Sequence, residues 1–196
     1  MEHKEKEFQT IQRVKIEEIQ TIITEKEQLA DSEASEEKVE YAFVFNSFFE
    51  QEFNDPEEVL DKNKGKVARE ARAYVCIKIE WERNTFLLPL RRDLANMPNH
   101  PLFKKACYPV PSTERVNAGL DFRKIIVVND DSLYKIEEAR ISSKQKKIIQ
   151  DNFEEIKEQA IAYIKGFKKS AKKNRQKRDS LYKYSALNNF LEELGI

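Results

Sequence analysis

The chain has 196 residues, of which 40% are hydrophobic and 36% charged, a composition that favours one folded core of ordinary domain size over a disordered polypeptide. No stretch approaches the ~20 consecutive apolar residues that cross a bilayer, and the charged first residues are unlike a signal peptide, so we expect a cytoplasmic protein. Cys76 and Cys107 are too few for a disulfide framework, which fits a reducing compartment.

The net charge of zero conceals a division along the chain. Residues 1–60 hold six Lys and Arg against seventeen Asp and Glu, a balance of −11, so the remaining residues carry +11. A basic body behind an acidic front favours a polyanion as partner. Charged helices that are simply solvated are the alternative explanation of this pattern.

The first third of the chain indicates two parts. Residues 5–30 carry apolar side chains at largely helical spacing, which predicts an amphipathic helix. The small, acidic stretch 30–38 is typical of a linker. We therefore divide the chain into a helical extension with its linker, residues 1–38, and a main domain, residues 39–196. The aromatic and branched run Tyr41–Phe49 begins that domain like a strand.

The middle of the chain contains the clearest pair of strands. After a turn or helix start at Asp55-Pro56, residues 73–82 and 84–90 flank a tight turn and predict a β-hairpin. Pro89 predicts that the second strand ends at an edge or a bulge, where a missing N–H is tolerated. The long segment 91–118 has four prolines and little periodicity, and a segment of this kind is usually functional or disordered.

Strand and then helix follow in the last third. Residues 120–129 contain a continuous apolar run and predict a further strand. Alternation along it places Lys124 on one face with Phe122 and Ile126, and Arg123 on the other face. Residues 142–169 predict helical structure, and residues 184–194 a short final helix. These elements indicate an α+β fold.

Side chains that can bind phosphate or move a proton gather around the long segment. Arg91 and Arg92 follow the second hairpin strand, where their guanidinium groups would be held in fixed positions. His100 is the only histidine besides His3 of the charged tail, so it is the candidate for proton transfer near neutral pH. The segment closes with hydroxyl and basic residues, and one lysine lies on the next strand: Ser112, Thr113, Arg115 and Lys124. A surface histidine and two solvated arginines are the alternative explanation.

A second group of residues suits binding to a polyanion. The run 168–178 holds seven basic and no acidic residues: Lys168, Lys169, Lys172, Lys173, Arg175, Lys177 and Arg178. Lys104, Lys105 and Arg115 are further candidates. Phe167, Tyr182 and Tyr184 lie nearby and could stack on unpaired bases. An exposed helix end and ordinary core contacts are the alternatives.

Several other chemistries lack a motif in this sequence. No His, Cys, Asp and Glu cluster has metal-ligand spacing, and with four glycines there is no phosphate-cradling loop. No nucleophile-elbow pattern is present. We therefore expect neither a metal nor a cofactor.

The order of five segments is more specific than any single motif. They are YAFVF at 41–45, AYVCIKIEWERNTFLLPLR at 73–91, His100, GLDFRKIIVVN at 119–129 and YKYSALNNFLEEL at 182–194. Together they resemble the ToxN/AbiQ superfamily of toxins from type III toxin–antitoxin systems, most closely its TenpN-like branch. The resemblance covers residues 40–196, and the LPLR and GLDFRK pieces weigh most.

The resemblance implies a fold and an activity. The fold would be a small, partly open antiparallel β-barrel like that of MazF-like ribonucleases, decorated by helices. The activity would be metal-independent, sequence-specific cleavage of cellular or phage RNA to a 2′,3′-cyclic phosphate, serving phage defence. A small structured RNA antitoxin made of tandem repeats would inhibit the toxin and assemble with it into a closed hetero-oligomer.

We expect five residues to act on the RNA: Arg91, Arg92, His100, Ser112 and Lys124. The resemblance covers Arg91, His100 and Lys124 of these. Two features depart from the branch's pattern. Arg92 stands where a Ser is usual, and the spacer 93–99 before the histidine is longer. Ser112 or Thr113 would then supply the hydroxyl. The extension before residue 40 lies outside the resemblance.

Two other functions fit the same sequence. One is a non-catalytic module that holds a structured RNA without cutting it. The other is a structural or adaptor protein whose N-terminal helix self-associates and whose basic run is only solvated. Cleavage in the presence of EDTA separates the first from an enzyme, and failure to co-purify with nucleic acid favours the second.

Overall fold

The structure is a computed structural model that describes residues 38–59, 75–94 and 104–196. Several predictions lie outside these residues. They are the amphipathic helix at 5–30, nearly all of the linker at 30–38, and His100 with its surrounding segment. Residues 39–196 form one compact unit.

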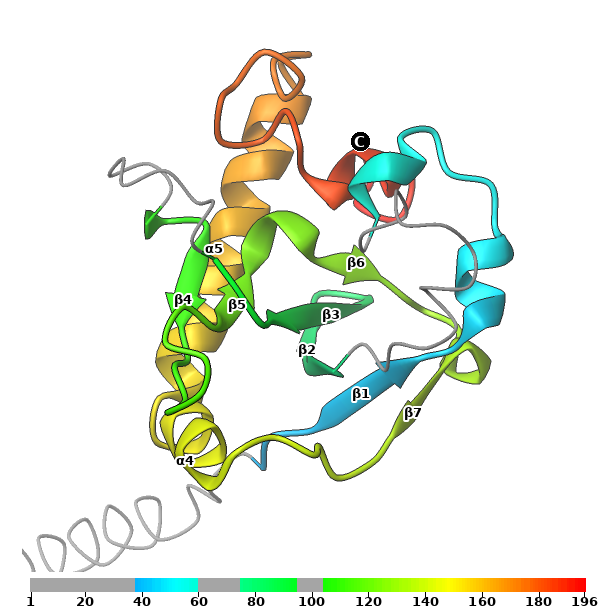
Figure 1. The fold of residues 1–196 in the computed structure, drawn as a ribbon. Coiled ribbons are helices and arrows are strands. Elements are labelled where there is room, and N and C mark those ends of the chain that lie inside the picture. Colours follow the sequence, from blue (N-terminus) through cyan, green and yellow to red (C-terminus); the bar gives the residue numbers. More distant parts are fainter. Residues whose placement is uncertain (1–37, 60–74, 95–103) are drawn as a thin grey trace, which may run out of the picture. The chain divides into compact units, whose positions relative to one another are not determined.

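A seven-stranded, antiparallel sheet forms the centre of this unit (Figure 1). Its strands are β1 (Tyr41–Val44), β2 (Val75–Trp81), β3 (Asn84–Arg91), β4 (Cys107–Pro109), β5 (Gly119–Asp121), β6 (Ile126–Val127) and β7 (Tyr134–Ile136). The order is β4-β5-β3-β2-β1-β7, with β6 also paired to β3. Across the described residues the sheet does not close into a barrel, because β4 and β7 lie at its two edges. The predicted α+β class is confirmed at this level.

The predicted hairpin is confirmed as β2 and β3. Trp81 pairs with Asn84, so the connection is the two-residue turn Glu82-Arg83. Glu82 has a φ of 54°, the left-handed conformation that tight two-residue turns require. Strand β3 of this hairpin ends at Arg91.

Pro89 occupies a gap between two ladders of β3. It pairs with Cys76 of β2 on one side. On the other side β3 pairs with β6 through residues 86–87 and with β5 through residues 90–91. Pro89 thus lies between the segments of β3 that pair with β6 and with β5, where a missing backbone N–H is tolerated.

The predicted continuous strand 120–129 is wrong, because a 3-10 helix, η4 (Phe122–Lys124), divides it into β5 and β6. The Asp121 side chain accepts a hydrogen bond from the amide of Arg123 and caps this turn. Phe122 is fully buried, and its ring centroid lies 6.2 Å from that of Tyr163. Burial of Phe122 and capping by Asp121 together favour the turn over a regular strand.

Two helices account for the predicted helical region. They are α4 (Ser143–Asp151) and α5 (Phe153–Ala171), and the chain breaks between them at Asn152. Ser142 and Gln145 form a capping box at the start of α4. The buried face of α5 joins the main core: Ile156, Ala160, Tyr163, Ile164 and Phe167. Among the described helices, none has the length and apolar character of a membrane-crossing segment.

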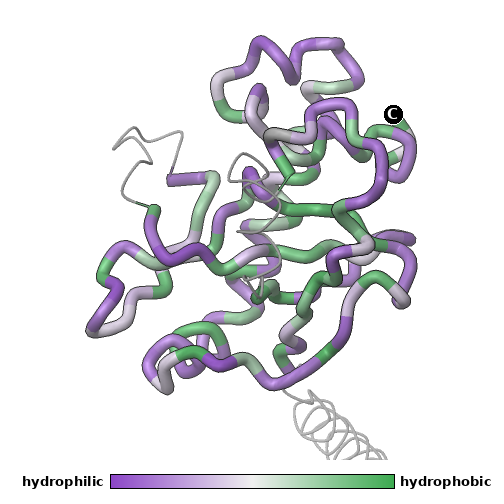
Figure 2. Tube along the Cα trace, turned by 45° about the vertical axis from the view of Figure 1, so that its right-hand side comes forward, coloured by the Kyte–Doolittle hydropathy of each residue, from purple (hydrophilic) through white to green (hydrophobic). Residues whose placement is uncertain are grey.

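Short 3-10 helices replace regular structure at both ends of the domain. The first strand stops at Val44, and η1 (Asn46–Glu50) follows, because Phe48 turns into the core. η2 (Pro56–Glu58) and η5 (Asp131–Leu133) lie in connections. The final segment contains η6 (Ala186–Asn189) instead of the expected helix over residues 184–194. Figure 2 shows hydrophobic positions crossing the middle of this unit, while the loop at the top of the view is mostly hydrophilic.

Candidate functional site

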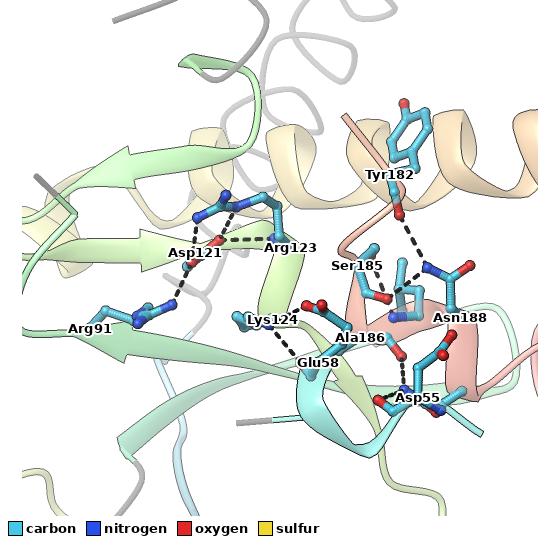
Figure 3. A network of polar contacts seen from close by, with 12 residues as sticks. Asp55, Glu58, Arg91, Asp121, Arg123, Lys124, Tyr182, Ser185, Ala186 and Asn188 are labelled. Carbon is cyan, nitrogen blue, oxygen red and sulfur yellow. Dashed lines mark hydrogen bonds and ion pairs between the residues drawn. The ribbon is translucent and has the colours of Figure 1, made fainter. Parts of the chain in front are cut away.

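A fully buried carboxylate, that of Asp121, lies at the end of β5. Its Oδ1 accepts hydrogen bonds from the backbone N and the Nε of Arg123, each at 3.1 Å. Its Oδ2 accepts from Nη1 of Arg91 at 3.1 Å and from Nη2 of Arg123 at 3.2 Å. Burial of a carboxylate is costly unless it is paired and hydrogen-bonded, and these contacts meet both conditions (Figure 3).

Asp121 therefore fixes two arginines beside each other. The side chains of Arg91 and Arg123 keep exposed fractions of 31% and 19%. A carboxylate fixes the orientation of a guanidinium group, and the planar shape of that group matches the oxygens of a phosphate. We call Arg91, Asp121 and Arg123 the arginine pair site.

Strand pairing brings the two arginines together. Arg91 ends β3 and pairs with Gly119 of β5, two residues before Asp121. A Cβ on Gly119 would collide with the carbonyl oxygen of Tyr108 and with the side chain of Leu94. Glycine at this position thus permits the close approach of β4 to β5 beside the site.

Arg123 is the residue of this site that sequence reasoning missed. Alternation along a continuous strand separated it from Lys124 and gave it no role. The turn η4 removes that alternation and directs Arg123 back to Asp121. An Asp followed two residues later by an Arg, at a turn between strands, is the sequence signal that was available.

The alternation predicted that Lys124 projects from a strand, and the structure shows that this prediction is wrong. It lies in η4, where its Nζ donates to the Oε2 of Glu58 at 2.7 Å and to the carbonyl oxygen of Glu58 at 2.9 Å. The exposed fraction of its side chain is 15%. Glu58 neutralises the ammonium group, so the observed contact ties η2 to η4 (Figure 3).

The other predicted site residues are spread around this region. Arg92 is exposed directly after β3. Ser112 is buried, and its Oγ accepts a hydrogen bond from the amide of Arg115 at 3.1 Å, while Arg115 is half-buried. This contact closes a turn. Thr113, Lys104 and Lys105 are exposed. His100 lies outside the described residues.

Cys107 faces the same carboxylate from the neighbouring strand, since it pairs with Asp121 across β4 and β5. Burial raises the pKa of the Cys107 thiol, the charge of Asp121 raises it further, and Arg123 opposes this effect. The neutral thiol is therefore favoured, and a thiolate nucleophile is disfavoured here. Among the described residues, no group of three or more His, Cys, Asp or Glu is placed to hold a metal ion.

The basic run divides into anchored and exposed residues. The Nζ of Lys168 lies 2.8 Å from Oε2 of Glu82 and 5.2 Å from the ring centroid of Trp81, so it fastens α5 to the hairpin. Lys177 pairs with Asp55 at 3.0 Å. The other five are exposed: Lys169, Lys172, Lys173, Arg175 and Arg178.

The three aromatic residues near the basic run have different environments. Phe167 and Tyr182 are buried in the core, where their ring centroids lie 5.9 Å apart, so the alternative of core contacts holds for both. Tyr184 has an exposed fraction of 55%. Tyr184 alone of the three can present its ring to a ligand.

Comparisons of this chain with protein-family models, curated proteins and solved structures give no match.

Proposed function

We propose that this protein is a metal-independent endoribonuclease, the toxin of a type III toxin–antitoxin system, as its resemblance to the TenpN-like branch of the ToxN/AbiQ superfamily implies. The observation that carries the proposal is the arginine pair site. A buried carboxylate that fixes two partly exposed guanidinium groups is a preorganised site for the charge of a phosphate. The basic balance of residues 61–196 supports a polyanionic partner.

The proposed reaction needs no metal. The 2′-oxygen of one nucleotide loses its proton and attacks the adjacent phosphorus, the bond to the 5′-oxygen breaks, and that oxygen takes up a proton. The products are a 2′,3′-cyclic phosphate and a free 5′-hydroxyl. Arg91 and Arg123 would stabilise the charge that grows on the phosphorane oxygens. His100 would move a proton.

Two of the remaining predicted catalytic residues have contacts that favour structural roles. Lys124 is paired with Glu58, and the Ser112 hydroxyl closes a turn. Arg92 is exposed beside Arg91 and would contact the RNA backbone. In this proposal the chemistry rests on Arg91, Arg123 and His100.

The proposal extends to the fold and the partners. The antiparallel sheet would be related to the partly open barrel of MazF-like ribonucleases, and helix α5 against its core supports a decorated sheet of that kind. The inhibitor would be a small structured RNA antitoxin in a hetero-oligomer, the substrate cellular or phage RNA, and the setting cytoplasmic. A non-catalytic RNA-binding module remains the alternative, because an arginine pair also binds phosphate without chemistry.

Incubation with RNA in EDTA, followed by analysis of the product ends, tests the proposal. We expect wild-type protein to yield 2′,3′-cyclic phosphates, and Arg91→Ala and His100→Ala to lose about 10²-fold or more in rate. Arg140→Ala is the matched control, since Arg140 is an exposed arginine before α4. Binding without cleavage by the wild type would establish the non-catalytic alternative.

A further inference from the structure

The chain after α5 forms a basic loop that projects from the rest of the domain. Asn174 adopts a left-handed conformation with a φ of 52°, and the amide of Arg175 donates to the carbonyl oxygen of Ser170 at 3.0 Å. These features end the helix and reverse the chain. Figure 1 shows the reversal as the orange loop that leaves the end of α5.

Charge on this loop is nearly of one sign. Between Lys172 and Tyr184 the sequence has six basic residues and one acidic residue, Asp179. The Asp179 side chain accepts a hydrogen bond from the amide of Leu181 at 3.0 Å and so holds the next turn. Within the part of the chain that the structure describes, Lys177 is the loop residue with an ion pair, to Asp55. Four further cations are exposed and have no ion pair with another described residue: Lys172, Lys173, Arg175 and Arg178.

An exposed aromatic ring follows this loop. Tyr182 is buried against α5, and a Cβ on Gly166 would collide with its hydroxyl, so Tyr182 anchors the segment. Tyr184, two residues later, has an exposed fraction of 55%. The Nζ of Lys183 lies 4.4 Å from the centroid of the Tyr184 ring. Tyr184 is thus an exposed ring on an anchored backbone, beside a cation.

We infer that Tyr184 and the basic loop 172–178 form a docking surface for an unpaired segment of RNA, built from other elements than the arginine pair site. Loop cations would contact successive phosphates, and one base would stack on Tyr184. Bases in a duplex are stacked on each other, so an isolated exposed ring favours an unpaired base. The choice of RNA as the polyanion rests on the proposed function.

Binding of 2′-O-methyl RNA tests this surface, because a blocked 2′-oxygen prevents the proposed cleavage. The probes are a short single strand, a duplex of the same length and an abasic strand with the same number of phosphates. We expect Tyr184→Leu to weaken single-strand binding by about 5- to 150-fold, the loss of one stacked base. Tyr184→Phe should bind normally, and Tyr184→Leu should leave abasic-strand binding unchanged.

The salt dependence of binding tests the loop. Replacing Lys172, Lys173, Arg175 and Arg178 with Gln should reduce the salt slope by roughly 0.7 per lost phosphate contact for single strands. As a control, replacement of three exposed cations in and before α4, Arg140, Lys144 and Lys147, with Gln should leave the slope unchanged. Single-strand binding by Tyr184→Leu equal to wild type, or an equal loss for the duplex, would overturn the inference.

The two proposals fail separately. If wild-type protein cleaves unmodified RNA while Tyr184→Leu binds the single strand normally, the docking surface is wrong and the proposed function stands. If Tyr184→Leu loses single-strand binding as expected while no RNA is cleaved, the surface stands and the protein is a binding module.

Discussion

Arg123 contacts Asp121 through both its guanidinium group and its own backbone amide. The carboxylate thus caps the turn that interrupts the predicted strand and fixes the arginine that the turn presents. Arg91 approaches the same carboxylate from β3. One buried residue therefore links the local backbone conformation to the charge of the candidate site.

Replacing Asp121 should reduce stability. Asp121→Asn keeps the size of the side chain but removes the charge between two arginines, and breaking a buried pair from one side typically costs about 3 kcal/mol or more. We expect the free energy of unfolding to fall by about 3 kcal/mol and not by much more, because both guanidinium groups are partly exposed. Urea unfolding measures it. Asp151→Asn is the control, because Asp151 pairs with Lys147 at the surface, and its loss should cost under about 0.5 kcal/mol. Equal stability of the two variants would contradict the role of Asp121.

The ion pair between Lys124 and Glu58 should stabilise the packing of η2 on η4. We expect a double-mutant cycle of Lys124→Met and Glu58→Gln to give a coupling energy of about 1 kcal/mol, between the values for exposed and buried pairs, since both side chains are partly buried. Urea unfolding of the four proteins supplies the cycle. A coupling energy near zero would show that the contact does not contribute to stability.

Gly166 should resist substitution although it lies within a helix. Alanine usually stabilises a helix by about 1 kcal/mol relative to glycine. In α5, however, a Cβ would collide with the hydroxyl of Tyr182. We therefore expect Gly166→Ala to destabilise the fold by about 1 to 3 kcal/mol. Tyr182→Phe in the same chain should restore most of the loss, measured by thermal unfolding. Higher stability of the single variant would contradict the contact.

Stability should fall at high pH partly through Tyr134. Burial, with a further effect of the hydrogen bond to Asp131, raises the pKa of Tyr134 from 10.0 to about 12. The folded state thus keeps the phenol proton that the unfolded chain releases, so this contribution is complete below pH 10 and is lost between pH 10 and about pH 12. Tyr134→Phe should unfold with a shallower pH dependence in that range. An unchanged pH dependence would contradict this assignment.

The sequence predicted the hairpin well because its signals are local. Alternating residues and a tight turn define β2 and β3, and they place Arg91 at a strand end. The division of residues 120–129 was not predicted by the same pattern, because the alternation of apolar residues does not account for a turn that depends on the Asp121 cap and on burial of Phe122. Because a continuous strand was predicted, Arg123 was placed on the face opposite Lys124 and left out of the site. The same prediction wrongly placed the Lys124 side chain on the face of a strand.

The basic run 168–178 likewise has one feature that the sequence predicts locally and another that depends on tertiary contacts. Its charge density was evident from composition, but which cations are paired depends on distant partners, Glu82 for Lys168 and Asp55 for Lys177. Likewise, three nearby aromatic residues could not be ranked from sequence. Packing against α5 buries two of them and leaves Tyr184 exposed.

The rate of RNA cleavage under single-turnover conditions, at saturating RNA and in EDTA, tests the central claim most directly. Arg91→Lys and Arg123→Lys keep a positive charge but lose the planar fork that Asp121 fixes. We predict that each loses about 10²-fold in rate, the usual effect of removing one donor from a transition-state charge, and that Arg140→Lys is unaffected. Rates for both variants equal to that of the wild type would contradict a catalytic arginine pair.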